Sequence, residues 1–274
     1  MQGKVCLVTG ANGSVGKATV AGLVRQGATV ILACRDQARG EAALAEVKSA
    51  ANKAQAELLL VDLASQASVR TFAEEFTKRY ERLDVLVHNA AIYKQERTLS
   101  ADGLEMMFAT NHLAPFLLTH LLLERLKASA PARVLTVTAP STTRLNFDDL
   151  QGEQRFSALT AFGASKMCNL LFSYELARQL AGSGVTANAV HPGLVKSGLM
   201  REAAAPIRWL TSLISAPPEK AAASLVDLAS SPAVEGTTGA FFTGKKTIKS
   251  NAYSHDESVQ RQLWDVSLQL SGLA

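Results

Sequence analysis

The sequence has few cysteines, no long apolar run and only a small net charge. The 274 residues include three scattered cysteines, which neither build a disulfide framework nor cluster around a metal, and which fit a reducing compartment. No stretch reaches membrane-span length, and the first apolar run begins so close to Met1 that we expect no signal peptide. The net charge of +4 comes without a long basic run, so nucleic acid is not indicated. We expect a cytoplasmic protein without a metal or a transmembrane segment.

Repeats, linkers and low-complexity segments are also missing, so residues 1–274 are predicted to form a single domain. Apolar residues make up 47% of the chain, which is ample for a large buried core. Strand-like and helix-like patterns alternate along the chain. The expected strands span about 5–9, 28–33, 56–61, 83–87, 133–137, 185–190 and 239–243, and the expected helices 17–27, 36–53, 65–80, 103–128, 158–182, 217–230 and 257–270.

A glycine-rich turn joins the first strand to the first helix. Gly10, Gly13 and Gly16 follow an apolar run of strand length and precede apolar residues at helical spacing. Strand, glycine turn and helix together indicate a site for dinucleotide phosphates, because backbone N–H groups can approach the pyrophosphate at the helix N-terminus. We predict that the cofactor contacts the three glycines of this loop and also Asn12, Ser14 and Val15. The alternative is an ordinary strand-to-helix turn.

The alternation predicts an α/β fold, a Rossmann-type doubly wound parallel sheet of about seven strands with helices on both faces. Ligands of such sheets bind outside the carboxyl ends of the strands. That rule places one group of residues along a common rim: the loop 10–16, Arg35, Asp62, Asn89, Thr138 and Pro192.

Several motifs in this order resemble the short-chain dehydrogenase/reductase family over essentially the whole chain. They are Thr9-Gly10 to Gly16, Asp62-Leu63, Asn89-Ala90-Ala91, Asn111, Lys166 and Pro192-Gly193. Four further segments resemble its retinol dehydrogenase and protochlorophyllide reductase branch. These are Ala33-Cys34-Arg35-Asp36, Thr110-Asn111-His112-Leu113-Ala114-Pro115-Phe116, Asp149-Leu150-Gln151-Gly152-Glu153 and Arg261-Gln262-Leu263-Trp264-Asp265-Val266-Ser267.

The end of the second strand bears on the choice of cofactor. An acidic residue there would bond the ribose of NAD, but this chain has Cys34 followed by Arg35. A guanidinium pairs well with a 2′-phosphate, so we predict NADP(H); the alternative is a solvated surface charge. The resemblance implies that Asp62 lies at the adenine edge, although it could instead cap the next helix. It also implies cofactor contacts for Leu63, Asn89, Ala90, Lys166, Pro192, Gly193 and Val195.

The glycine loop departs from the commoner family pattern at one position. Ser14 stands where a glycine is expected, and Gly13 precedes it. We predict that Ser14 turns its hydroxyl toward a phosphate or caps the helix, and that Gly13 takes the unusual backbone conformation.

The reaction centre departs further. The resemblance implies a tyrosine four residues before Lys166 and a serine after the fifth strand, but this chain has Phe162 and Ala139. In the family, the tyrosine gives a proton to the substrate oxygen, the serine steadies that oxygen, lysine lowers the tyrosine pKa, and asparagine positions a water. Lys166 and Asn111 are retained. Carbonyl chemistry is therefore expected to be very slow, with Thr138, Ser141, His191 and Tyr93 as candidate substitutes.

Residues 197–216 correspond to the family's substrate lid. Their apolar residues suggest a hydrophobic ligand or a membrane surface, or else a helix packed on its own core. A homodimer is compatible with the sequence. Three functions stay open: an NADP(H)-dependent oxidoreductase for a hydrophobic substrate with impaired or non-standard chemistry, an inactive NADP(H)-binding pseudoenzyme, and a non-redox enzyme that reuses the pocket.

Overall fold

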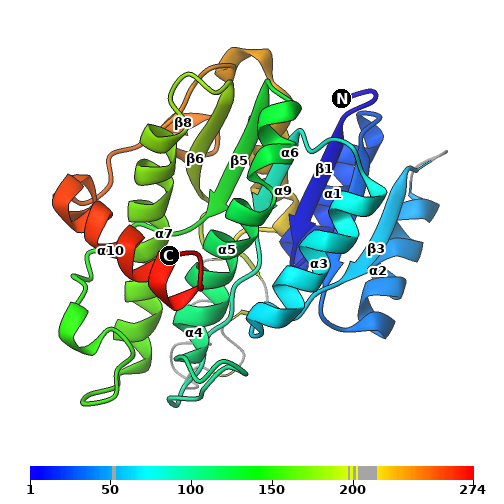
Figure 1. Cartoon of the computed structure of the whole chain (residues 1–274). Helices are drawn as coiled ribbons and strands as arrows, with labels where there is room; N and C mark the ends of the chain where they lie inside the picture. Colours follow the sequence, from blue (N-terminus) through cyan, green and yellow to red (C-terminus); the bar gives the residue numbers. More distant parts are fainter. Residues whose placement is uncertain (51–53, 197, 200–201, 203–214) are drawn as a thin grey trace.

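The computed structural model describes residues 1–50, 54–196, 198–199, 202 and 215–274 (Figure 1). Its centre is an eight-stranded sheet in the order β3-β2-β1-β4-β5-β6-β7-β8. The predicted α/β doubly wound fold is confirmed. The strands are β1 Val5–Thr9, β2 Thr29–Cys34, β3 Ala56–Leu60, β4 Val85–His88, β5 Ala132–Val137, β6 Val185–His191, β7 Phe241–Thr243 and β8 Lys246–Thr247.

The strands from β1 to β7 pair in parallel, so their carboxyl ends meet at one edge of the sheet. Strand order reverses between β1 and β4, which makes that point the topological switch of the sheet. The eighth strand, β8, was not predicted. It pairs antiparallel with β7 through a tight turn in which Gly244 has φ of 60°, a conformation that favours glycine.

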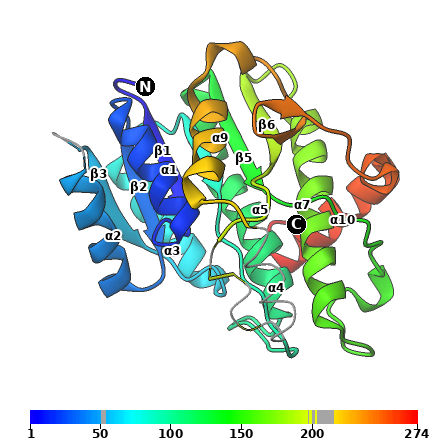
Figure 2. The ribbon, with the colours of Figure 1, turned by 180° about the vertical axis from the view of Figure 1, so that it is seen from behind.

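Helices cover both faces of the sheet, as Figures 1 and 2 show. One face packs against α1 Ser14–Arg25, α2 Gln37–Ser49 and α9 Pro218–Ser230. The other packs against α3 Gln66–Arg79, α5 Ala114–Leu121 and α7 Ala158–Gln179. The helix α10 Glu257–Leu270 lies on the outer side of α7, and α6 Leu123–Ala128 follows α5. Burial of the strands between two helical layers explains their continuous Val, Ile and Leu content.

The single long helix expected at 103–128 is wrong. The chain instead forms α4 Met106–Phe108, a π-turn η1 Ala109–Leu113, α5 and α6. The N–H of Ala114 donates to the carbonyl of Ala109, five residues back, and the next residue, Pro115, has no N–H to continue the ordinary ladder. The wider turn contains Asn111, which places an irregular backbone at a predicted site residue.

Three short 3₁₀ turns complete the described elements: η2 Phe147–Asp149, η3 Pro232–Val234 and η4 Ala252–His255. None of the helices in the described ranges combines the length and apolar character that crossing a bilayer requires. Most of the predicted substrate lid at 197–216 lies outside the described residues.

Candidate active site

The glycine loop connects β1 to α1 at the switch point of the sheet. Gly10 has φ of 62°, and a Cβ there would lie 2.9 Å from Cα of Ala90. At Gly16 a Cβ would lie 2.4 Å from the carbonyl oxygen of Gly10. Both positions therefore exclude a side chain, because the turn, the helix and the end of β4 touch through their backbones.

The expectation for Gly13 and Ser14 is wrong in its backbone detail. Gly13 is the N-cap of α1 with φ of −76°, which any residue adopts, and Gly10 has the positive φ. Ser14 is already helical and does not cap the helix. Its hydroxyl donates to the carbonyl of Lys196, at 3.4 Å. Without a side-chain cap, the first N–H groups of α1 stay available to an anion.

Asn89 and Ala90 brace this loop from the end of β4. The Asn89 side-chain amide donates to the carbonyl of Thr9 at 2.9 Å and to that of Gly10 at 3.3 Å. The Thr9 hydroxyl accepts from the backbone N–H groups of Asn89 and Ala90, both at 3.1 Å. The two predicted cofactor residues thus fix the shape of the glycine loop; contact with a cofactor stays a prediction.

The end of β2 presents Cys34 and Arg35 beside the same loop. Burial raises the pKa of the Cys34 thiol to about 11, although hydrogen bonds from the backbone of Asn12 and Ala11 oppose that shift. Cys34 is therefore an unreactive thiol that packs against the loop. The Arg35 side chain is exposed, and within the described ranges no carboxylate forms an ion pair with it.

Arg39 is a basic residue that the sequence reasoning missed. It lies in the first turn of α2, four residues after Arg35, and its backbone N–H donates to the Asp36 carboxylate at 2.9 Å. Its positive charge lowers the pKa of the Cys34 thiol, against the larger effect of burial. The spacing of four residues between the two arginines was the available signal.

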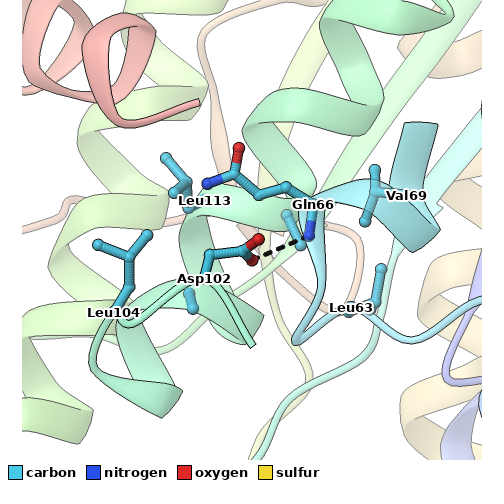
Figure 3. A pocket seen from close by; sticks show the side chains of 8 residues that line it. Leu63, Gln66, Val69, Asp102, Leu104 and Leu113 are labelled. Carbon is cyan, nitrogen blue, oxygen red and sulfur yellow. Dashed lines mark hydrogen bonds between the residues drawn. The ribbon is translucent and has the colours of Figure 1, made fainter. Parts of the chain in front are cut away.

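Asp62 and Leu63 follow β3 on the same edge. One Asp62 carboxylate oxygen accepts from the N–H of Ala64 at 2.9 Å, whereas the N-cap of α3 is Ser65. Leu63 lines a small pocket where the backbone N–H of Gln66 donates to Asp102 at 2.9 Å, as Figure 3 shows. The other lining residues are Val69, Leu104, Ala109, Leu113 and Ala114. The pocket and the predicted adenine contacts thus share Leu63.

The π-turn directs Asn111 into a fully buried position. Its side-chain amide donates to the carbonyl of Ile92 at 3.0 Å and to the hydroxyl of Ser165 at 3.1 Å, and its oxygen accepts from the N–H of Ile92 at 2.8 Å. The structure thus brings Asn111 to the residue that precedes Lys166. Ser165 was missed, and its position next to Lys166 was the only signal for it.

Lys166, Phe162 and Tyr93 lie together near the start of α7. The Lys166 ammonium lies 5.2 Å from the centre of the Phe162 ring, and the Tyr93 ring meets the other ring edge-on, with centres 5.6 Å apart. Lys166 is 5% exposed. Burial lowers its pKa to about 8. The sequence predicts Lys166 and Phe162 one turn apart on a helix and names Tyr93 only as a candidate substitute acid; its packing against Phe162 comes from the structure.

The segment after β5 and the loop after β6 lie at the same edge of the sheet, formed by the carboxyl ends of the parallel strands. Ala139 lies just beyond β5, and the neighbouring Thr138 hydroxyl donates to the carbonyl of Lys166 at 2.8 Å. His191 ends β6, and burial lowers its pKa. Pro192 and Gly193 follow it, and Val195 pairs in a bridge with Ala216.

The described residues contain no group of three or more His, Cys, Asp or Glu side chains arranged to hold a metal. The reactive groups that do gather are an ammonium, an amide and several hydroxyls. Such groups bind and polarise an organic substrate.

Comparison with known proteins places this site in a family. The model for short chain dehydrogenases matches residues 4–207. Retinol dehydrogenase 14 of Homo sapiens is 42% identical over 294 residues, covering 100% of this chain and 88% of that protein. An uncharacterized protein from Mycobacterium paratuberculosis has a crystal structure with a TM-score of 0.82 and 32% identity, covering 99% of this chain and 94% of that one.

A further solved structure, from Beutenbergia cavernae, contains bound NADP. It is 26% identical with a TM-score of 0.72, and the match covers 89% of this chain and 95% of that one. The matched family model covers most of the chain, and retinol dehydrogenases align along its whole length. The chain belongs to the short-chain dehydrogenase family.

Proposed function

We propose that the protein is an NADP(H)-dependent oxidoreductase for a hydrophobic carbonyl or alcohol, working slowly because its acid is replaced. The observation that carries the proposal is an uncapped α1 N-terminus at the same edge of the sheet as the buried Lys166 and Asn111, whose amide bonds Ser165 next to Lys166. The first suits a pyrophosphate, and the second suits a nicotinamide ribose and its substrate.

The residues present fit a nicotinamide dinucleotide. Gly10 and Gly16 leave no room for side chains between the turn and the helix, so phosphates can meet backbone N–H groups directly. On this proposal, the loop residues 10–16 hold the pyrophosphate, Asp62 and Leu63 meet the adenine, and Lys166 meets the nicotinamide ribose. A bound nicotinamide supplies or accepts a hydride.

NADP(H) is favoured over NAD(H) by charge. Arg35 directly follows β2 and Arg39 lies in the first turn of α2, so the segment after β2 carries two guanidinium groups where an acidic residue would repel a 2′-phosphate. The NADP bound in the relative from Beutenbergia cavernae is compatible with this choice.

A hydrophobic substrate is favoured by the surroundings of Phe162. Tyr93, Met107 and Ala158 form a buried apolar cluster, against which Phe162 and other partly buried side chains pack. The relatives named retinol dehydrogenases suggest an apolar alcohol or aldehyde of that kind.

Phe162 and Ala139 are proposed to stand in the positions of the family's tyrosine and serine. Loss of a positioned general acid lowers rates by roughly 10²–10⁴, and loss of an oxyanion donor by about 10²–10³. The two losses act on one oxygen and need not multiply. The expected enzyme binds its cofactor well and turns over slowly.

A second candidate function is an NADP(H)-binding protein without turnover. It is favoured by the hydroxyls around Phe162, because those of Thr138 and Ser141 already donate to main-chain carbonyls. A donor committed to the protein has to break that bond before it can serve a substrate.

Titration with NADPH and NADH, followed by nicotinamide fluorescence, tests the proposal first. We expect NADPH to bind at least about tenfold more tightly, which corresponds to about 1.4 kcal/mol. Hydride transfer to all-trans-retinal, measured at high protein concentration, then separates the slow oxidoreductase from the inactive binding protein. Equal affinities for the two nucleotides would remove the basis for NADP(H).

A further inference from the structure

Four hydroxyl groups on the segments around Phe162 donate to acceptors of the protein itself. The Ser141 hydroxyl donates to the carbonyl of Gly163, and that of Ser165 to the carbonyl of Phe162, each at 2.8 Å. The Thr138 hydroxyl donates to the carbonyl of Lys166, and the Tyr93 hydroxyl to the side-chain oxygen of Gln95 at 3.2 Å. None of these protons is free to move to a substrate in this arrangement.

Lys166 holds an acid of another kind beside position 162, an ammonium rather than an alcohol. It follows Phe162 by one helical turn, and its ammonium faces that ring at 5.2 Å from the centre, within the range of a cation–π contact. Among the ion pairs of the described residues, none includes Lys166. The ammonium is therefore held in place by burial and by the ring, and its protons are not committed to a carboxylate.

The environment of Lys166 also makes it a stronger acid than an exposed lysine. Burial alone lowers its pKa to about 8, with no charged neighbour contributing. A group with such a pKa is mostly protonated at neutral pH yet gives up its proton readily.

Other titratable and charged groups lie on the segments packed against α7. They are Tyr93 and Lys94 after β4, Glu105 before α4, His112 in η1, Arg133 in β5, His191 in β6, Tyr253 and His255 in η4, and Glu257, Arg261 and Asp265 in α10.

We propose that the Lys166 ammonium is the proton donor of this enzyme, in place of the phenol that position 162 lacks. The proposal rests on the oxidoreductase function proposed above. The carbonyl carbon of the substrate gains a hydride, the π electrons of the C=O bond move to oxygen, and that oxygen takes a proton from Lys166. The products are an alcohol, the oxidised nucleotide and a neutral Lys166 amine, which regains a proton from water.

The proton affinity of Lys166 can be measured in the free protein. In protein labelled with ¹³C at lysine Cε, the Lys166 signal is identified by its loss in Lys166→Arg, and its shift is followed against pH. We expect a midpoint near the pKa of about 8. A midpoint at the ordinary value of about 10.4 would overturn the proposal, because such an ammonium is a poor acid at neutral pH.

Single-turnover hydride transfer at saturating NADPH, with all-trans-retinal as the probe, tests the role itself. The rate in the unmodified protein should fall as the pH rises through about 8, because the donor is then deprotonated. Lys166→Met should lower the rate at neutral pH by roughly 10² or more. Lys166→Arg keeps the charge but is too weak an acid. Its hydride-transfer rate should therefore be low, and the fall in rate as the pH rises through about 8 should disappear. Lys94→Met, which removes a nearby cation that pairs with Glu202, is the matched control. It should keep the fall in hydride-transfer rate near pH 8.

The double variant Phe162→Tyr/Ala139→Ser distinguishes this proposal from the function on which it rests. If the double variant transfers hydride and the unmodified protein does not, Lys166 is not a donor, while the oxidoreductase proposal stands. If NADPH binds and neither protein transfers hydride, the oxidoreductase proposal fails, and this one with it. Transfer by the unmodified protein that is insensitive to Lys166→Met also overturns the role of Lys166.

Discussion

The two ends of the candidate site are built from different kinds of atoms: main-chain atoms at the glycine loop and side-chain atoms at the reaction end. The glycine loop consists of backbone: glycines that touch through main-chain atoms, and helix N–H groups without a side-chain cap. The reaction end consists of side chains, with Lys166, Asn111, Phe162 and Ala139 each contributing a group or lacking one. A backbone site survives many substitutions, whereas one lost oxygen atom removes an acid. On the proposed function, this difference would let a chain keep a cofactor loop while its reaction centre changes.

The largest expected effect comes from adding the two proposed oxygen donors at the reaction end. Phe162→Tyr with Ala139→Ser should raise hydride transfer to all-trans-retinal by roughly 10² or more, because both oxygen donors are added beside Lys166. Phe156→Tyr is the matched control, since it adds a hydroxyl elsewhere around the same apolar cluster and should bring no gain. An equal gain from both changes would mean that position 162 has no special role.

The next effect probes the backbone end. Gly16→Ala should weaken NADPH binding by more than about tenfold and destabilise the fold by about 1–3 kcal/mol. The reason is that the added Cβ would meet the Gly10 carbonyl oxygen at 2.4 Å and Cα of Ala11 at 2.8 Å, both parts of the backbone.

Gly13→Ala is the control for that change. Gly13 has an ordinary φ of −76°, and a Cβ there would meet its nearest atom at 3.3 Å. Thermal unfolding and fluorescence titration of the two variants should therefore give the larger loss for Gly16→Ala. A larger loss for Gly13→Ala would contradict the geometry of the loop.

A smaller effect concerns the side chain at the edge of the backbone site. Arg35→Asp should erase the preference for NADPH over NADH, a change of about tenfold in the ratio of the two dissociation constants. The physical reason is that a carboxylate repels the 2′-phosphate that the guanidinium attracts. Lys48→Asp, at the far end of α2, makes the same change of charge and should leave the ratio unaltered. A preserved ratio in Arg35→Asp would transfer the role to Arg39.

The smallest effect on NADPH binding is expected from a change at Asp84, which lies at the opposite edge of the sheet from the candidate site. The Asp84 carboxylate accepts from the N–H of Val5 at 2.8 Å and pairs with Lys4 and Arg82. Burial alone would raise its pKa, but the hydrogen bonds from Arg82 and Lys4 outweigh burial and hold the pKa below its ordinary value. The contribution of Asp84 to stability is thus present above the unfolded-state pKa of about 4 and is lost as the pH falls through the folded value.

Asp84→Asn should accordingly lower stability at pH 7 by about 1–3 kcal/mol, flatten its loss in acid and leave NADPH affinity unchanged. Urea unfolding at several pH values measures the first two, and fluorescence titration the third. Asp227→Asn breaks a pair with the exposed Lys245 and should cost at most about 1 kcal/mol. Weaker NADPH binding in Asp84→Asn would show that the two edges of the sheet are coupled.

Two motifs behind the family resemblance acquire a common explanation in the structure. His112, beside Asn111 in the π-turn, lies 2.9 Å from the hydroxyl of Ser267 in α10, and the Phe116 and Trp264 rings pack edge-on with centres 5.0 Å apart. The C-terminal helix therefore contacts the segment that carries Asn111. Both segments were recognised in the sequence, but nothing in their spacing indicated that they meet.

The sequence by itself determined the fold class, the position of the glycine turn and the presence of Arg35, Asn111 and Lys166, because strand alternation, glycine spacing and residue identity are local properties. It predicted the wrong backbone for Gly13 and a continuous helix through Asn111. The tertiary structure decided which hydroxyls are committed to carbonyls, that Tyr93 packs on Phe162, and that burial lowers the pKa of Lys166 to about 8. Those properties depend on neighbours that are distant along the chain, and only the packing of α7 against the sheet brings them together.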